Sequence, residues 1–324
     1  MHNKEISNSP VLDKDVTDIL ISIITPTFNR ADLITQTIDS IRNQSHSNWE
    51  LVIVDDHSTD ETITVINELQ KDEKRINCYQ RPNTYVKGAN ACRNYGIEKS
   101  NGQFLVFFDS DDIMHPDYLK DLLNTIHNEK DYEVAACKGI YFNIIEGETV
   151  YKNEVDYQNL SFPEDFISRK APFGTPNFII KSDILDKIDH WDESLFKAQD
   201  YDFFGRILLH YPCKFINKTL YYARGHNNNI TSSFFSNKNA KLTLSDYKSR
   251  KKIYHLAVSK GAVSNDFIDF VVAKQLTNFF HLLKMKKVFS AGEIFFHIIG
   301  IKTSPNKHKL IIDFFKKKLS NKFS

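Results

Sequence analysis

Residues 104–112 constrain the fold more than any other part of this 324-residue sequence, because five apolar residues end abruptly in three carboxylates. The aromatic and β-branched content of residues 104–108 favours a fully buried strand over a short helix. Side chains that follow such a strand face the crevice at the carboxyl edge of an open α/β sheet, where ligands bind. Asp109, Asp111 and Asp112 would repel one another there, so Mg²⁺ or Mn²⁺ fits the cluster. The competing interpretation is an acidic turn in which Asp112 caps the next helix.

Composition and charge exclude several classes of protein. With 41% hydrophobic and 26% charged residues, and Lys+Arg 42 against Asp+Glu 41, no charge excess indicates nucleic acid. The four cysteines lack the paired spacing of a zinc site or a disulfide framework, which fits a reducing cytoplasm. Residues 1–18 lack the layout of a signal peptide, and no apolar run approaches the ~20 residues of a transmembrane helix. We therefore expect a cytoplasmic protein, peripheral at most to the inner face of the cell membrane.

Apolar strands alternating with amphipathic helices predict an α/β fold with a mostly parallel central sheet. Strands are expected at residues 19–24, 51–54, 76–80 and 104–108, with Pro26 ending the first. Helices are expected from Asp32, from a capping box formed by Ser58 and Glu61, over residues 88–99, from Pro116 and near Asp200. Residues 133–157 and 178–180 predict further strands, whose direction the sequence leaves open, antiparallel included.

The composition changes beyond residue 226, where a Ser/Asn-rich run gives way to a helical pattern. From Val271 onward, eleven lysines stand against only Glu293 and Asp313, and phenylalanines are interleaved among them. This pattern suits amphipathic helices on an anionic membrane surface, and equally helices that pack on the main domain with a solvated lysine face. We expect an N-terminal extension at 1–18, a main domain at 19–235 and a basic helical region at 236–324.

Five short motifs occur along residues 19–231 in an order that resembles glycosyltransferase family 2, the inverting enzymes of the GT-A fold. The motifs are residues 23–30 (IITPTFNR), 54–60 (VDDHSTD), 88–96 (GANACRNYG), 109–112 (DSDD) and 200–202 (DYD). The resemblance implies a Rossmann-like nucleotide-diphospho-sugar transferase domain. It implies transfer from a nucleotide diphosphate sugar to a saccharide or lipid-linked saccharide in cell-surface polysaccharide biosynthesis, with Mn²⁺ or Mg²⁺ as cofactor.

The resemblance also implies which residues bind the donor. They are Pro26, Thr27, Asn29, Asp56, Arg93, Asp109 and Ser110. Asp56 would accept the N3–H of uracil, which predicts a UDP-sugar because cytosine has no such donor. Arg93 would meet the diphosphate or the base pocket, the alternative being a surface salt bridge. Asp109 would approach the ribose.

Further roles follow from the same resemblance. Asp111 and Asp112 would bind the metal, with His226 as a further ligand, although a histidine in a polar loop is often only a surface residue. Asp200 would be the general base that takes the proton from the acceptor hydroxyl. Gln199 replaces the glutamate that the family has before this base. Gln199 and Asp202 would contact the acceptor or support the site.

Other function classes fit the sequence less well. A nucleotidyltransferase acting on sugar phosphates would need a glycine-rich loop after the first strand, and residues 25–30 contain no glycine. A haloacid-dehalogenase-like phosphatase would carry its Asp-x-Asp on the first strand. A catalytically inactive nucleotide-sugar-binding relative would not need Asp56, Asp111 and Asp200 together.

Overall fold

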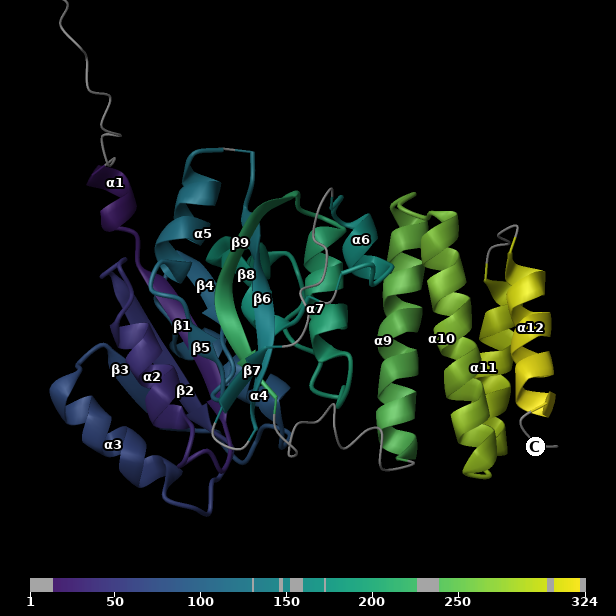
Figure 1. The fold of residues 1–324 in the computed structure, drawn as a ribbon, viewed down its shortest axis with the longest axis horizontal. Coiled ribbons are helices and arrows are strands. Elements are labelled where there is room, and N and C mark those ends of the chain that lie inside the picture. The colour runs from purple at the N-terminus through teal and green to yellow at the C-terminus, as the bar shows by residue number, and fades with distance from the viewer. Residues whose placement is uncertain are drawn as a thin grey trace, which may run out of the picture.

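The computed structural model describes residues 14–129, 131–145, 148–151, 160–171, 173–225, 239–301 and 306–320. It consists of a curved sheet with helices on both faces and a layer of C-terminal helices beside it (Figure 1). The predicted α/β class with a C-terminal helical extension is confirmed.

The sheet is mixed, with strand order β3-β2-β1-β4-β8-β6-β9-β5 and β7 paired to β6. The strands are β1 (Ile21–Thr27), β2 (Trp49–Asp55), β3 (Ile76–Gln80), β4 (Phe104–Phe107), β5 (Ile113–Met114), β6 (Val134–Ile145), β7 (Glu148–Tyr151), β8 (Phe178–Lys181) and β9 (Cys213–Arg224). The first four strands pair in parallel, as predicted. Beyond β4, only β6 and β9 pair in parallel, and the other pairs of described strands are antiparallel.

β1 continues past its predicted end, through Pro26 to Thr27. Its pairing with β4 stops at Ile24, opposite Phe107, whereas its pairing with β2 runs on to Thr27. One edge of β1 is therefore unpaired at Pro26, so a residue without an N–H is tolerated there. The extension brings Thr27 level with Asp55 at the carboxyl edge of the sheet.

The helices cover both faces of the sheet and form the C-terminal layer. They are α1 (Lys14–Thr17), α2 (Ile34–Arg42), α3 (Thr62–Asp72), α4 (Ala89–Lys99), α5 (Tyr118–His127), α6 (Glu164–Ile167), α7 (Gln199–Leu208), α9 (Ala240–Ser259), α10 (Asn265–Lys284), α11 (Val288–Gly300) and α12 (Lys307–Ser320), with 3-10 turns at Thr175–Asn177 and Ser182–Asp186.

Two predicted helix starts are wrong. Ser58 does not cap α3, because its hydroxyl donates to the Asp55 carboxylate at the end of β2. Asp60 instead accepts the N–H of Thr62, the first residue of α3, at 3.1 Å. Pro116 lies two residues before α5, and its carbonyl accepts the N–H of Ser45.

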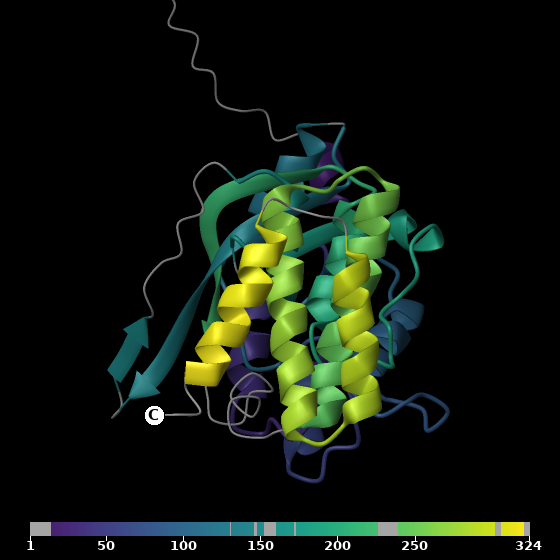
Figure 2. The same ribbon diagram turned by 90° about the vertical axis from the view of Figure 1, so that its right-hand side faces the viewer.

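Two hydrophobic cores lie on opposite faces of the sheet, since successive strand residues point to opposite sides. Ile23 packs with α2, α3 and α5, whereas Ile24 packs with α4, α6 and α7. The core that contains Ile24 continues without interruption into α9, α10 and α11. α9 packs on α7, and α10 lies against α9, α11 and α12 (Figure 2).

The C-terminal helices therefore pack on the main domain, which was one of the two interpretations of the basic region. The two sequence segments on either side of residue 235 share a core. Among the described residues, no helix is both long enough and apolar enough to cross a membrane.

Candidate active site

A cavity of about 1330 Å³ lies at the carboxyl edge of β1, β2 and β4 and extends to α7, α9 and α10. Eleven of the thirteen predicted site residues line it. They are Pro26, Thr27, Asn29, Asp56, Arg93, Asp109, Ser110, Asp111, Asp112, Gln199 and Asp200. Of the other two, Asp202 is buried outside the cavity, and His226 lies outside the described residues.

Asp56 follows β2 and is held by a buried cation that the sequence did not indicate. The Arg81 Nε lies 2.5 Å from Asp56 Oδ1, and both side chains are more than 90% buried. Arg81 Nη1 also donates to the carbonyls of Pro82 and Tyr85. Because Arg81 fixes one of its oxygens, Asp56 presents an oriented acceptor to the cavity.

Asn29 joins the loops that follow β1 and β2. Its N–H donates to Ser58 Oγ at 2.9 Å, and its Oδ1 accepts the N–H of Thr59 at 2.8 Å. Its φ of 51° lies in the left-handed region, which asparagine tolerates better than most residues. Asn29 thus lines the cavity and also sets the shape of its rim.

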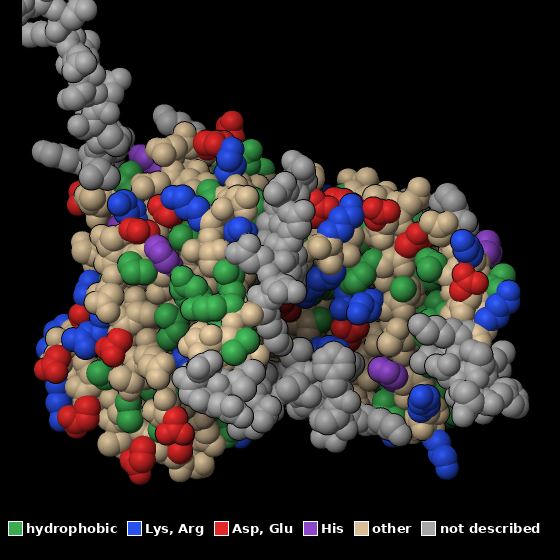
Figure 3. All heavy atoms as spheres, viewed as in Figure 1, with side chains coloured by type: hydrophobic (Ala, Val, Ile, Leu, Met, Phe, Trp, Pro, Cys, Tyr) green, Lys and Arg blue, Asp and Glu red, His purple; other side chains and the backbone are tan. Residues whose placement is uncertain are grey.

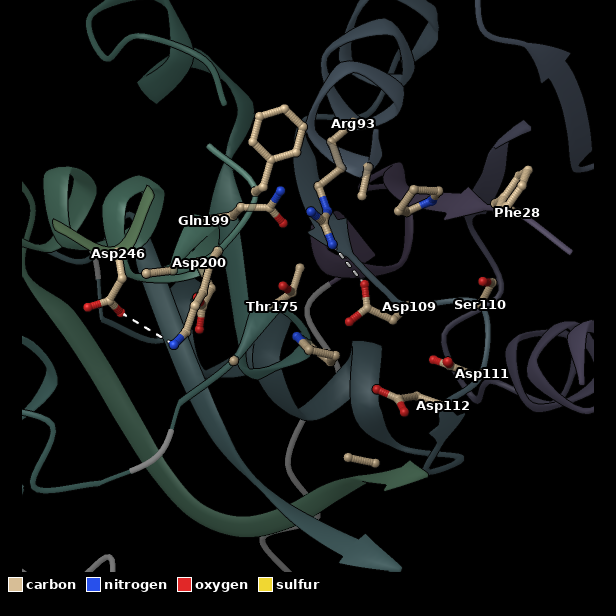
Figure 4. A pocket seen from close by; sticks show the side chains of 18 of the residues that line it. Phe28, Arg93, Asp109, Ser110, Asp111, Asp112, Thr175, Gln199, Asp200 and Asp246 are labelled. Carbon is tan, nitrogen blue, oxygen red and sulfur yellow. Dashed lines mark hydrogen bonds and ion pairs between the residues drawn. The ribbon is translucent and has the colours of Figure 1, made fainter. Parts of the chain in front are cut away.

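Asp109 and Asp111 lie in the loop after β4, and each is paired with an arginine. Figure 4 shows the pair of Asp109 with Arg93. Arg93 on α4 donates from Nη2 to Asp109 Oδ1 at 2.9 Å and stacks on the Trp191 ring. Arg30 Nε lies 3.3 Å from Asp111 Oδ2. Burial raises the pKa of Asp109, with Asp111 adding to the increase and Arg93 opposing it. At the Asp109 carboxyl, burial and repulsion from Asp111 therefore outweigh the attraction of Arg93.

Asp112, in the same loop, is held by contacts with β9 and α2. Its Oδ1 accepts the N–H of Arg224 in β9 at 3.0 Å, and its carbonyl accepts the Thr37 hydroxyl at 2.9 Å. The capping interpretation is wrong, because α5 begins only at Tyr118. Burial raises the pKa of Asp112 well above its usual value, and repulsion from Asp109 and Asp111 raises it further.

The residues present fit a divalent cation that the substrate helps to hold. No group of three or more His, Cys, Asp or Glu among the described residues is arranged to enclose a metal ion by itself. However, Mg²⁺ typically takes one or two carboxylates and completes its octahedron with water and substrate phosphates. Asp109 and Asp111 supply such a partial set at the cavity wall, and a cation would offset their repulsion. The sequence predicts Asp112 rather than Asp109 beside Asp111, but one Asp112 oxygen is engaged by the Arg224 N–H.

Asp200 lies in the first turn of α7, on the side of the cavity away from Asp111 (Figure 4). Its Oδ2 accepts from Arg169 Nη2 at 3.1 Å, and a quarter of its side chain is exposed. Gln199 also lines the cavity, and its side chain donates to the Leu195 carbonyl at 2.8 Å. Arg169 therefore orients Asp200 without covering it.

Asp202 points in a different direction from Asp200, as expected for residues two apart on a helix. Its side chain is 1% exposed and pairs with Arg206 at 3.0 Å and with Lys252 at 3.5 Å. The alternative in which Asp202 contacts the acceptor directly is therefore wrong, and its contacts are those of a residue that supports α7.

The family model described as Glycosyl transferase family 2 matches residues 22–188 of the sequence, which is more than half of the chain. The chain belongs to this family. The match contains the first four motifs of the sequence, whereas Asp200 lies beyond it.

Two relatives illustrate the similarity in sequence. The Campylobacter jejuni GalNAc(5)-diNAcBac-PP-undecaprenol beta-1,3-glucosyltransferase is 39% identical over 117 residues, 36% of this chain and 38% of that protein. The Bacillus subtilis putative teichuronic acid biosynthesis glycosyltransferase TuaG is 40% identical over 102 residues, 31% of this chain and 39% of that protein. The matched region thus spans about two fifths of the length of either relative.

Solved structures extend the similarity to most of the chain. S. aureus TarS 1-349 in complex with UDP matches with a TM-score of 0.56 and 20% identity, over 85% of this chain and 90% of that chain. The mannosyltransferase PcManGT from Pyrobaculum calidifontis, in complex with GDP-Man and Mn²⁺, matches with a TM-score of 0.54 and 16% identity, over 92% and 80%. These matches confirm the predicted GT-A fold.

Proposed function

We propose that this chain is an inverting glycosyltransferase that moves a sugar from a UDP-sugar to a saccharide or lipid-linked saccharide in cell-surface polysaccharide biosynthesis. The observation that carries the proposal is one cavity with Asp109 and Asp111 at one side and Asp200 at the other. Inversion needs this separation, because the acceptor hydroxyl attacks the anomeric carbon from the face opposite the leaving diphosphate.

Each group has a distinct task in the proposed reaction. Asp200 takes the proton from the acceptor hydroxyl as its oxygen attacks, while Arg169 keeps the carboxylate aimed at it. Arg93 and Arg30 place guanidinium groups beside the site of the diphosphate. Asp111, with Asp109, would hold Mn²⁺ or Mg²⁺, and a cation bound there supplies Lewis-acid stabilisation of the leaving diphosphate.

The names of related proteins support the chemical class. The C. jejuni relative is named for an acceptor linked through PP to undecaprenol, and the B. subtilis relative for teichuronic acid. TarS has been solved with UDP and with UDP-GlcNAc, and PcManGT with GDP-Man and Mn²⁺. Because the nucleobases differ between these structures, the proposal of a uracil nucleotide for this chain rests on Asp56 and not on the solved structures.

The proposal is tested by incubating purified protein with a panel of nucleotide sugars, Mn²⁺ or Mg²⁺, and short saccharide acceptors. We expect release of UDP from at least one UDP-sugar, with an inverted anomeric centre in the product. Complete inactivity against the panel, with UDP failing to bind, would contradict the proposed function.

Donor preference gives a prediction for Asp56. We expect UDP to bind about 10-fold more tightly than CDP, because a carboxylate accepts the uracil N3–H and meets only an acceptor in cytosine. In Asp56→Asn the amide can donate to cytosine N3, so the preference should narrow or reverse. Calorimetry with both nucleotides measures this, and tighter binding of CDP to the wild-type protein would contradict the assignment.

We further propose that α11 contacts an anionic membrane surface. Phe289 is 99% exposed and Phe296 is 74% exposed, so two large apolar side chains of this helix are uncovered. Lys286 and Lys287 immediately precede the helix and are exposed. Exposed aromatic rings beside lysines suit the interface of an anionic bilayer, where each lysine contributes about 1 kcal/mol.

The double variant Phe289→Ser/Phe296→Ser should bind anionic liposomes roughly 10- to 100-fold more weakly than wild type, because two apolar side chains no longer enter the bilayer. Co-sedimentation at low salt measures the effect. A control on β7, Val150→Ser/Tyr151→Ser, also removes two exposed apolar side chains and should sediment like wild type. Equal sedimentation of all three proteins would leave α11 with a packing role only.

A further inference from the structure

The active-site cavity continues past Asp200 into a region lined by α9 and α10, which the predicted site residues do not reach. Lys197, Arg250, Lys274 and Lys284 line this part, with Asp246 as the carboxylate among them. Figure 3 shows Lys and Arg atoms gathered in the recess between the sheet and the C-terminal helices. We call the four cations and Asp246 the basic end of the cavity.

Asp246 is already fully engaged by side chains around it. Arg250 Nε and Nη2 donate to its two oxygens, each at 2.9 Å, and Asn278 donates to Oδ2 at 2.9 Å. Lys197 Nζ lies 4.0 Å from Oδ1. Arg250, Lys197 and Lys274 therefore share one carboxylate, and Arg250 makes the closest contacts with it.

Arg250 retains one hydrogen-bond donor that no described residue around it uses. Nη1 of the buried Arg250 has no hydrogen-bond acceptor in the described parts of the chain. Burial lowers the pKa of Lys197 to about 8; Asp246 opposes this shift, while Arg250 and Lys274 add to it. Burial and the nearby Arg250 also lower the pKa of Lys274. An anion placed here would offset the repulsion among these groups.

We propose that the basic end of the cavity binds a phosphate group of the acceptor and so positions the acceptor hydroxyl at Asp200. This inference rests on the proposed function, because it names the acceptor of the same reaction. A phosphate oxyanion offers several acceptor oxygens to a guanidinium and two ammonium groups that approach from different elements. The basic end lies near Asp200, because Lys197 is three residues before Asp200 in the sequence and the Asp200 carboxylate interacts electrostatically with Arg250. The bound phosphate would thus lie on the acceptor side, apart from Arg93 and Arg30 on the donor side.

The test uses the full-length protein saturated with UDP and Mn²⁺, so that phosphate probes meet a filled donor site. The probes are a glycerol phosphate trimer, a short-chain prenyl diphosphate and a neutral glycerol oligomer. We expect both phosphate probes to bind and the neutral oligomer not to bind. Tighter binding of the trimer would indicate a polymeric phosphodiester acceptor, and tighter binding of the diphosphate a lipid-linked one.

The variant Lys274→Gln should weaken phosphate-probe binding about 10-fold and reduce its salt dependence, since a cation is lost without removing the Asp246–Arg250 pair. Lys248→Gln is the matched control, because Lys248 is exposed on α9 and does not line the cavity. It should bind the probes like wild type. UDP affinity, measured for each variant, reports folding and the donor site.

Two results would overturn the inference. One is phosphate-probe binding by Lys274→Gln equal to that of wild type, and the other is no phosphate-probe binding by the UDP-bound wild-type protein. Failure of the wild-type protein to bind UDP at all would instead count against the proposed function. The two proposals therefore fail in distinguishable ways.

Discussion

Asp200→Asn is expected to lower turnover by about 10²- to 10⁴-fold while the affinity for UDP stays near that of wild type. The other carboxylates of the cavity have different partners. Asp109 is paired with Arg93, and Asp112 accepts the Arg224 N–H. Asp200 is partly exposed, is held from one side by Arg169 and lies away from the acidic loop. The asparagine side chain keeps the shape and an acceptor for Arg169 but cannot take a proton.

Asp202→Asn is the matched comparison, because it makes the same change two residues away in the same helix. Its carboxylate is buried against Arg206 and Lys252, so the variant should lose thermal stability while its folded fraction remains active. Turnover per folded molecule, UDP calorimetry and Tm separate the two effects. The assignment of the base would be wrong if Asp202→Asn were inactive with fold and UDP binding intact, or if Asp200→Asn turned over normally.

The first half of the fold could be predicted closely because buried parallel strands are continuous apolar runs. The predicted strand at residues 76–80 is β3 itself, and the runs at 51–54 and 104–108 lie within one or two residues of β2 and β4. β5 and β9 were not predicted. The two residues of β5 are a strand only through pairing with β9, and much of β9 is half-exposed, so neither has a strong local pattern.

The acids of the site could be predicted because they lie in short motifs that directly follow strands or begin a helix. Their cationic partners could not be predicted in the same way. Arg81 and Arg169 meet Asp56 and Asp200 through tertiary structure, across 25 and 31 residues of sequence. Residue spacing carries no signal for such pairs, whereas Arg30 stands within the first motif.

The C-terminal region shows what composition leaves open. A surplus of lysines determines the net charge of the region, but it does not show which side of a helix each lysine occupies. Lys274 lines the active-site cavity, while Lys286 and Lys287 are exposed beside Phe289. One basic sequence thus contributes to an internal site and to an outer surface, and only the packing of α10 against α9 and α11 separates the two groups.

Asp111→Asn is expected to abolish measurable turnover, with a loss of at least about 10³-fold, and excess chelator should do the same to the wild-type protein. The reason is that Asp111 would help to hold the cation that stabilises the leaving diphosphate. A structural explanation competes with this one: Asp111 Oδ2 lies 3.3 Å from Arg30 Nε, and in that explanation the carboxylate serves only to fix the arginine. The two explanations differ in their response to metal.

Measuring turnover and UDP affinity across a Mn²⁺ titration distinguishes them. If Asp111 binds metal, UDP affinity should rise with Mn²⁺ in the wild-type protein and much less in Asp111→Asn. Asp112→Asn serves as the control in the same loop, because an asparagine oxygen can still accept the Arg224 N–H and should preserve most of the metal response. Arg30→Gln should weaken UDP binding at every Mn²⁺ concentration. Full activity in excess chelator, with Asp111→Asn behaving like Arg30→Gln, would show that the Asp111 carboxylate only orients Arg30. The leaving diphosphate would then have to be stabilised by the arginines around the loop, without a metal ion.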